Sequence, residues 1–185
     1  MVVFDTDFLS FFFSDNAGAV IDPGSGLPVE RVKERVEHLF ECLGERKQKI
    51  VIPTPVLAEI LIFCQTEKGA MKAQDEILHH FTSDRNFDLA PFDVMAAVEA
   101  AQMFAGIRKG DKRDGSRKTW AELKFDKQIV AIAKVRKADI IYSNDRGLSK
   151  HAKACGINAV AVWDLPLPPP QQAELFDKDE GPTVE

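Results

Sequence analysis

The sequence is poor in the side chains that hold zinc, copper or iron. It contains three cysteines and four histidines among its 185 residues. Cys42, Cys64 and Cys155 lack the short spacings of a zinc knuckle, and their odd number does not suit a disulfide framework, so we expect buried thiols in a reducing cytosol. His79 and His80 are adjacent, and neighbours on a helix point about 100° apart, so they cannot chelate one ion together.

Long apolar runs are also missing. The run Phe8–Phe13 is far shorter than the roughly 20 residues that a membrane-spanning helix needs. No basic segment precedes it and no small-residue cleavage site follows it, so we expect no signal peptide and no membrane partner. These absences favour a cytoplasmic protein.

Net positive charge is absent as well, because the formal charge is −5, which argues at first against a nucleic-acid partner. The distribution of charge changes that interpretation. Residues 171–185 carry five acids against Lys178, whereas residues 108–118 hold six basic residues against two acids. A basic loop on a nearly neutral body is compatible with phosphate contact. An ordinary solvated surface loop is the alternative that the charge pattern leaves open.

Apolar periodicity predicts strands alternating with helices. We expect strands over 2–6, 49–52, 86–90, 139–143 and 158–163, and helices over 8–13, 28–43, 54–64, 70–81, 94–107, 120–135 and 148–155. This alternation predicts an α/β fold, a three-layer α/β/α sandwich with a mainly parallel sheet of about five strands. One domain should span residues 1–165, and the Pro-rich, acidic tail 166–185 should be disordered.

Four carboxylates occupy positions where burial makes an unpaired charge costly. Asp5 and Asp145 each follow an apolar, strand-like run, while Glu59 and Asp126 interrupt apolar helical stripes. Such groups must neutralise or find a cation. Several acids without basic partners indicate a hard divalent ion, and the lack of histidine and cysteine ligands favours Mg²⁺ or Mn²⁺. We therefore take these four acids as candidate metal ligands and catalytic residues.

Topology supports a common site for these acids. In a parallel sheet the ligand crevice lies beyond the carboxyl ends of the strands, where Asp5 and Asp145 are expected. Two simpler explanations remain open. Asp5 and Asp145 can cap the helices that follow them, and Glu59 and Asp126 can lie on exposed helix faces.

Other residues near these strand ends are candidates for substrate contact. Thr6 and Ser143 flank the acids and can bind a water molecule or a phosphate, although hydroxyls at strand ends are common. Asn144 and Arg146 are candidates for orienting the substrate. From the basic loop we add Lys112, Arg113, Arg117 and Lys118.

Four segments of the chain resemble the PIN-domain nucleases, in particular the VapC-type toxins of toxin–antitoxin pairs. They are VVFDTDFL at 2–9, IPTPVLAEIL at 52–61, KFDKQIVAIA at 124–133 and IIYSNDRGL at 140–148. The resemblance implies an endoribonuclease that depends on Mg²⁺ or Mn²⁺, with Asp5, Glu59, Asp126 and Asp145 as its acids. It also implies an RNA substrate, an antitoxin partner and a homodimer. The apolar run Phe8–Phe13 supports the dimer, since it exceeds what one short helix should bury within its own domain.

Two alternatives accompany this interpretation. The start Phe4-Asp5-Thr6-Asp7 also looks like that of haloacid-dehalogenase-like phosphatases, in which Asp5 would be a covalent nucleophile and Asp7 a general acid. That scheme leaves Glu59 and Asp126 without a role. The second alternative is a catalytically inactive PIN-like scaffold that binds RNA or protein. Asp7 itself can bind a metal through water or cap a helix.

Overall fold

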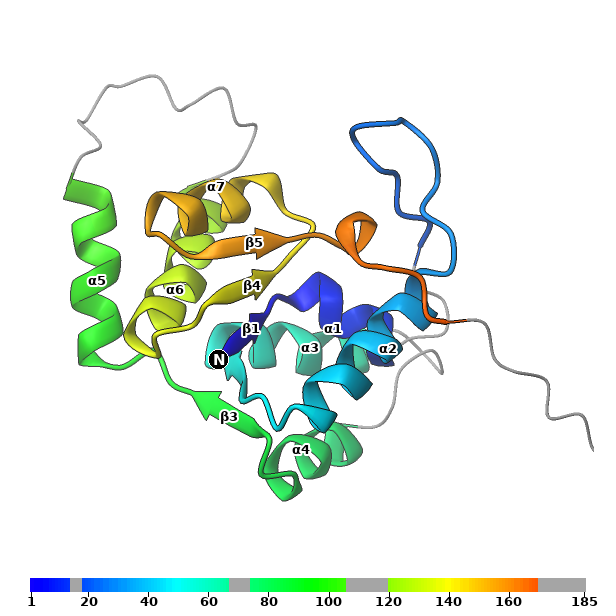
Figure 1. Cartoon of the computed structure of the whole chain (residues 1–185). Coiled ribbons are helices and arrows are strands. Elements are labelled where there is room, and N and C mark those ends of the chain that lie inside the picture. The colour runs from blue at the N-terminus through cyan, green and yellow to red at the C-terminus, as the bar shows by residue number, and fades with distance from the viewer. Residues whose placement is uncertain (14–17, 67–73, 106–119, 170–185) are drawn as a thin grey trace, which may run out of the picture.

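Five short strands form one parallel sheet (Figure 1). The computed structural model describes residues 1–13, 18–66, 74–105 and 120–169. The strands are β1 (Val2–Phe4), β2 (Ile50–Pro53), β3 (Phe87–Ala90), β4 (Ile140–Tyr142) and β5 (Asn158–Val160). They are ordered β3-β2-β1-β4-β5, and all four neighbouring pairs run parallel. The prediction of a parallel sheet of about five strands is confirmed.

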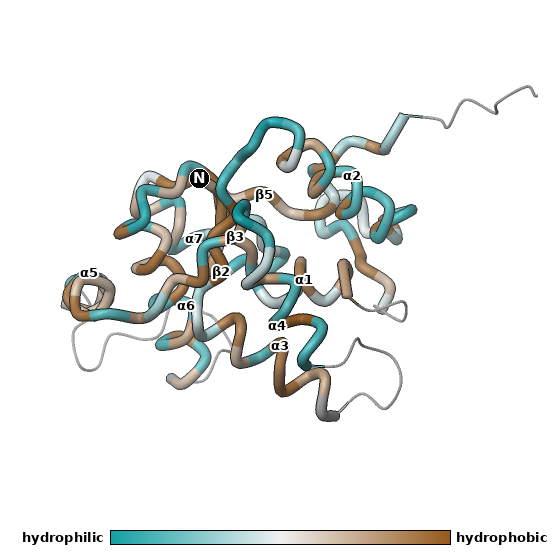
Figure 2. Tube along the Cα trace, turned by 90° about the horizontal axis from the view of Figure 1, so that it is seen from below, coloured by the Kyte–Doolittle hydropathy of each residue, from teal (hydrophilic) through white to brown (hydrophobic). Residues whose placement is uncertain are grey.

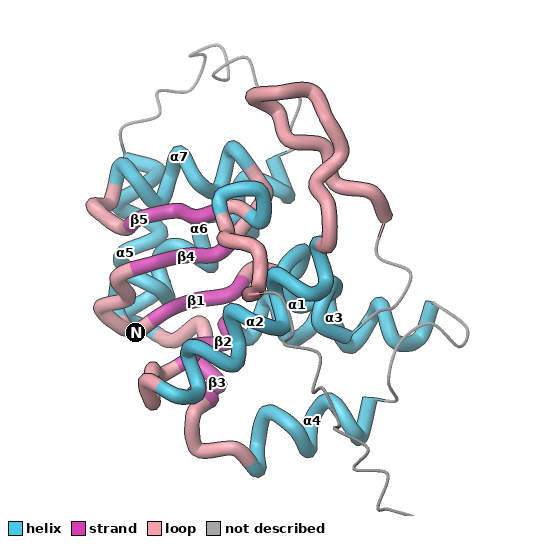
Figure 3. The backbone as a smooth tube through the Cα atoms, turned by 45° about the vertical axis from the view of Figure 1, so that its right-hand side comes forward, coloured by secondary structure: helices cyan, strands magenta, loops and turns pink. Residues whose placement is uncertain are grey.

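Helices cover both faces of this sheet, as Figure 3 shows with α2 on one side and α6 and α7 on the other. The helices are α1 (Thr6–Phe13), α2 (Val32–Glu45), α3 (Thr54–Thr66), α4 (Gln74–Ser83), α5 (Val94–Ala105), α6 (Trp120–Val135) and α7 (Arg146–Ala154). The three-layer prediction is therefore confirmed. No helix in the described ranges is long and apolar enough to cross a membrane.

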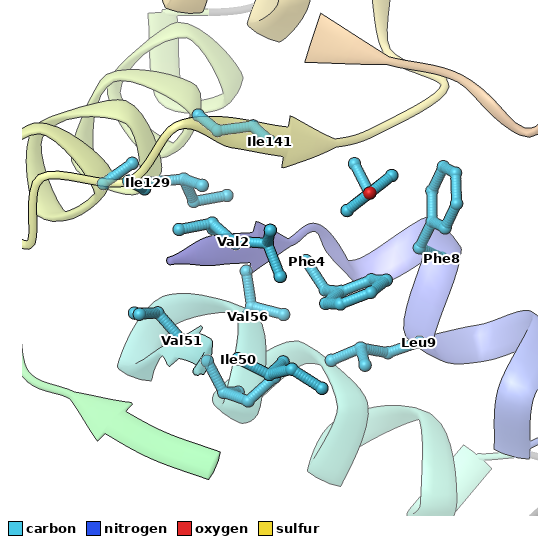
Figure 4. Packing of buried hydrophobic residues seen from close by; sticks show 14 of the residues in the cluster. Val2, Phe4, Phe8, Leu9, Ile50, Val51, Val56, Ile129 and Ile141 are labelled. Carbon is cyan, nitrogen blue, oxygen red and sulfur yellow. The ribbon is translucent and has the colours of Figure 1, made fainter. Parts of the chain in front are cut away.

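Aromatic rings and branched side chains fill the space between the sheet and its helices (Figure 4). Phe4 and Tyr142 are register partners on adjacent strands, and their rings stack with centroids 4.9 Å apart. Phe4 also stacks on Phe40 of α2 at 4.6 Å. Because β1 is buried along its whole length, its position is fixed from both faces.

The apolar run on α1 is buried within the domain, contrary to our expectation. Phe8 and Leu9 have no exposed surface, and Phe11 and Phe13 are also buried. Apolar side chains are instead exposed on α5, which lies at the edge of the molecule (Figure 2). Val94, Met95 and Val98 are 79%, 62% and 48% exposed. The run 8–13 therefore gives no support for a dimer.

The helix predicted to begin at Pro28 begins later, at Val32. Pro28 pairs with Ile21 in an antiparallel bridge, and Asp22 N–H donates to the carbonyl of Leu27 at 2.9 Å. Gly26 closes this small hairpin with a φ of 73°, a conformation that glycine adopts readily. Residues 28–31 thus belong to the hairpin and its exit.

Two further boundaries and the burial of the cysteines differ from the prediction. Gly44, expected to end α2, lies inside the helix, which continues to Glu45. β5 ends at Val160, because Val162–Asp164 form a 3₁₀ turn, η1, where a strand was expected. The thiols of Cys42, Cys64 and Cys155 are free, as expected, but half-buried where full burial was predicted.

Candidate active site

A pocket of about 520 Å³ lies where the carboxyl ends of β1 and β4 meet. This is where the strand order reverses, because the chain proceeds outward from β1 to β3 on one side and from β4 to β5 on the other. Asp5, Glu59, Asp126 and Asp145 all line the pocket. The fold therefore brings these four acids, separated by up to 140 positions in the chain, to one place.

Two more acids line the same pocket, Asp7 and Glu122. Glu122 was missed at the level of sequence, although it lies four residues before Asp126 and such pairs share one helix face. Among the described residues that line the pocket there is no lysine or arginine. Ile62, Phe63 and Phe125 supply apolar surface to it.

Asp5 is held by two hydrogen bonds. Its Oδ1 accepts from the backbone N–H of Thr6 at 2.8 Å, and its Oδ2 accepts from the hydroxyl of Ser143 at 2.7 Å. Burial is the main cause that raises the pKa of Asp5 to about 7, and the negative charges of Asp7 and Glu59 add to it. The hydrogen bonds from Ser143 and Thr6 oppose the rise because they favour the ionised form. Asp5 is thus a carboxyl group that would ionise more readily beside a cation.

Thr6 positions Glu59. Its side-chain hydroxyl donates a hydrogen bond to Glu59 Oε2, which joins the start of α1 to α3. Thr54 and Pro55 start α3, so Glu59 lies just over one turn into that helix. A contact between Thr6 and substrate stays a prediction.

Asp145 both caps a helix and lines the pocket. Its Oδ1 accepts from the backbone N–H groups of Gly147 at 2.6 Å and Leu148 at 3.0 Å, which satisfies the first turn of α7. The capping role considered from the sequence is confirmed, and it explains why α7 begins at Arg146 and not at Leu148. Asp145 N–H in turn donates to Ser143 Oγ at 3.0 Å.

Asp126 lies on the pocket side of α6, and the next residue, Lys127, points toward α5. Asp126 is buried, so the interpretation as an exposed helix face is wrong for this residue. Lys127, also buried, donates from Nζ to the carbonyl of Met103 on α5 at 2.8 Å. The Lys127 ammonium lies 3.8 Å from the centre of the Phe104 ring, so its charge serves the contact between α5 and α6.

The donor set suits a hard divalent ion, because the pocket offers carboxylate oxygens and no sulfur or imidazole ligand among its described lining residues. Nevertheless, within the described parts of the chain no three acidic, histidine or cysteine side chains are arranged to hold a metal. Thr6 and Ser143 draw Glu59 and Asp5 into hydrogen bonds, and the cap fixes Asp145. The described residues of the pocket therefore supply suitable oxygen ligands, but these are not arranged around one point as they would be in a metal-bound site.

The remaining candidates lie around the pocket or outside the described residues. The Ser143 side chain is completely buried between Asp5 and Asp145. Asn144 Oδ1 accepts from Val162 N–H at 2.9 Å, and Asn144 and exposed Arg146 line two neighbouring hollows. The loop residues named as substrate contacts fall outside the described ranges; they are Lys112, Arg113, Arg117 and Lys118.

Solved structures of FitAcB, VapBC2 and VapC20 have a fold similar to that of this chain. A chain of FitAcB from Neisseria gonorrhoeae matches with a TM-score of 0.54 and 19% identity, over 89% of this chain and all of that one. A chain of VapBC2 from Rickettsia felis, bound to a promoter DNA fragment, matches with a TM-score of 0.56 and 12% identity, over 87% and 98%. VapC20 from Mycobacterium tuberculosis, a sarcin–ricin loop cleaving toxin, matches with a TM-score of 0.50 and 15% identity, over 81% and 94%.

At these identities the likeness establishes the fold that the sequence motifs predicted. No protein-family model matches the sequence. No curated protein matches it either.

Proposed function

We propose that this protein is an endoribonuclease that depends on Mg²⁺ or Mn²⁺ and acts as the toxin of a toxin–antitoxin pair. The observation that carries the proposal is the acid pocket, in which Asp5, Glu59, Asp126 and Asp145 converge without a described lysine or arginine in its lining. A pocket of this charge repels an RNA phosphate unless a metal ion neutralises it. The likeness to VapC20, a toxin that cleaves the sarcin–ricin loop, supports the choice of RNA.

Each acid has a proposed task in phosphodiester hydrolysis. Asp5, Asp126 and Asp145 would hold the metal directly or through water, and Glu59 would bind a second ion or orient the attacking water. When bound, the ion supplies a water of lowered pKa and neutralises charge that develops on the phosphate. Ser143 and Thr6 keep Asp5 and Glu59 oriented during the reaction, because each donates a hydrogen bond to its acid.

The substrate is expected to be single-stranded or looped RNA, whose unstacked bases allow the backbone to enter a recessed pocket. In-line attack would leave a 5′-phosphate and a 3′-hydroxyl. The antitoxin and homodimer belong to the same proposal. The likeness to VapBC2, which is bound to a fragment of its promoter DNA in its structure, supports an antitoxin partner.

The phosphatase alternative fits the site less well. If Asp5 were a covalent nucleophile and Asp7 a general acid, Glu59 and Asp126 would have no function although both line the same pocket. A binding module without catalysis has no need for six acids in one pocket.

One experiment separates these functions. The purified protein is incubated with a mixed-sequence single-stranded RNA in Mn²⁺, in Mg²⁺ and in EDTA, and the termini of the products are analysed. We expect metal-dependent internal cleavage with 5′-phosphate ends. Hydrolysis of p-nitrophenyl phosphate without RNA cleavage would favour the phosphatase, and neither activity with tight RNA binding would favour the inactive module.

A further inference from the structure

We infer that a basic hollow along α7 holds the RNA backbone on its way out of the acid pocket. The inference rests on the proposed ribonuclease function and assigns a specific path to its substrate. The basic hollow has a volume of about 360 Å³. The lining residues that carry the argument are Arg146, Lys150, Lys153 and Trp163.

The cations of the basic hollow lie on one side of α7. Arg146, Lys150 and Lys153 follow at intervals of four and three residues, which places them on a single helix face. All three are exposed, whereas Leu148 and Ala152 of the same helix are buried against the core. The basic face is therefore turned to solvent, and one acid, Asp164, offsets part of its charge among the described lining residues.

Trp163 gives the basic hollow an aromatic surface. It lies in the 3₁₀ turn η1, which is held by a hydrogen bond from Ala161 N–H to Asp164 Oδ2 at 3.2 Å. Its side chain is half-buried and lines the basic hollow together with the cations. Cationic groups beside an aromatic face are the usual elements of a surface for single-stranded nucleic acid, in which bases stack while phosphates meet the cations.

A second hollow connects this surface to the acid pocket. With a volume of about 460 Å³, it shares Asp7 with the acid pocket and shares Asn144, Arg146 and Trp163 with the basic hollow. Its other wall is the hairpin that begins at Gly18, which stands beside η1 in Figure 1. A strand leaving the acid pocket past Asp7 thus meets Arg146, the first residue of α7, and then Lys150 and Lys153 further along that helix.

Electrostatics favour this direction. Six carboxylates in the acid pocket repel every phosphate except the one that a metal ion neutralises, so flanking phosphates need cations elsewhere. The basic hollow supplies three cations next to the pocket. The three hollows are continuous, and their lining changes from acidic in the pocket to basic along α7. Both features suit a bound nucleic-acid strand.

The test measures binding of a fluorescein-labelled single-stranded RNA of about 12 nucleotides in Mg²⁺, in an Asp126→Asn background in which the RNA stays intact. Replacing Arg146, Lys150 and Lys153 with alanine should weaken binding. The slope of the logarithm of the binding constant against the logarithm of the salt concentration should fall in magnitude by about 2, because each lost phosphate contact removes roughly 0.7. The matched control replaces Arg46, Lys49 and Arg85, which lie at the opposite end of the strands, and should keep the slope.

Trp163 is tested by a pair of substitutions. Trp163→Leu keeps apolar packing but removes the stacking face and should weaken binding roughly 5- to 100-fold, whereas Trp163→Phe should retain most of the affinity. Equal losses in the two variants would overturn the stacking role.

The outcomes also separate this inference from the proposed function. If the wild-type protein cleaves RNA and the triple variant keeps its salt slope, the path along α7 is wrong, the ribonuclease stands, and α7 is left as a surface for a protein partner. If the wild-type protein neither cleaves nor binds the RNA, both proposals fail.

Discussion

Ser143 donates a hydrogen bond of 2.7 Å to Asp5 Oδ2 across 138 positions of sequence. The same hydroxyl accepts from the backbone N–H of Asp145 at 3.0 Å. One buried side chain therefore sets the relative positions of the acids that follow β1 and β4. Partners that orient metal ligands in this way typically contribute about 10- to 100-fold to metal affinity or activity.

Ser143→Ala should lower RNA cleavage by about 10- to 100-fold. The substitution removes the hydrogen bond that favours ionised Asp5 and leaves Asp145 N–H without its acceptor. Loss of that buried partner should reduce the free energy of unfolding by about 1–3 kcal/mol. Cleavage rate and chemical denaturation are the measurements, and Ser10→Ala, whose hydroxyl donates only to the Asp7 carbonyl, is the control. Equal rates for the two variants would remove Ser143 from the proposed site.

The metal-free protein should lose stability as pH rises from about 4 to about 7. Asp5 has an ordinary pKa of 3.8 when unfolded and a pKa of about 7 when folded, so between these values the folded state keeps a proton that the unfolded state has released. Its stabilising contribution is full below the lower pKa and is lost as pH passes the higher one, up to about 4 kcal/mol.

The measurement for Asp5 is a melting series across this pH range in EDTA, with Asp5→Asn as the comparison. The variant should show a flatter dependence. A parallel series in Mn²⁺ should show stability rising with pH, because a bound cation favours the ionised acid. Superimposable curves for wild type and Asp5→Asn would mean that Asp5 does not titrate in this range.

Asp126→Asn should reduce cleavage roughly 100-fold or more while the fold is kept. The amide has nearly the same shape as the acid and relieves repulsion in a pocket lined by five other carboxylates, so metal-free stability should hold or rise. Cleavage in Mn²⁺ and melting in EDTA check the two halves of this prediction. The exposed Asp75→Asn on α4 serves as control, and wild-type cleavage by Asp126→Asn contradicts the assignment.

The proposed homodimer should use the exposed apolar face of α5. Val94, Met95 and Val98 are exposed on one face of α5, and contiguous exposed apolar patches mark protein–protein interaction sites. We expect wild-type protein to sediment as a dimer at concentrations on the order of micromolar, and Val98→Glu to shift it to monomer. Leu27→Glu, at a hairpin residue that is 65% exposed, should leave the dimer intact. A monomeric wild type would reject the prediction.

The sequence predicted the central strands well because β1 and β2 are buried along their whole length and therefore form continuous apolar runs. The boundaries that failed depend on contacts that periodicity does not contain. Pro28 has the residue type of a helix start but pairs with Ile21, and Arg31 takes a left-handed φ of 54° just before α2. The burial of residues 8–13 depends on the side chains that the fold packs against them. These include Phe40 and Phe81, whose rings lie beside those of α1.

The convergence of the four acids on one pocket could be predicted, because two of them follow buried strands and two interrupt apolar helical stripes. Glu122 could have been added from its spacing to Asp126. The hydrogen bonds of Thr6 and Ser143 could not be predicted from the sequence. Each joins elements that are far apart in the chain, so its geometry depends on the folded structure.

Lys127 follows Asp126 directly in the chain, and its ammonium group donates a hydrogen bond to the carbonyl of Met103 in the last turn of α5. The helix that carries Asp126 and the helix that bears the exposed apolar face are therefore mechanically joined. A protein that docks on α5 and rotates it would move the carbonyl that Lys127 contacts, next to Asp126 in the chain. By thermodynamic reciprocity, any change in metal affinity caused by that docking is matched by an equal effect of the metal on the docking partner. Inhibition of such an enzyme would then not require its inhibitor to enter the pocket.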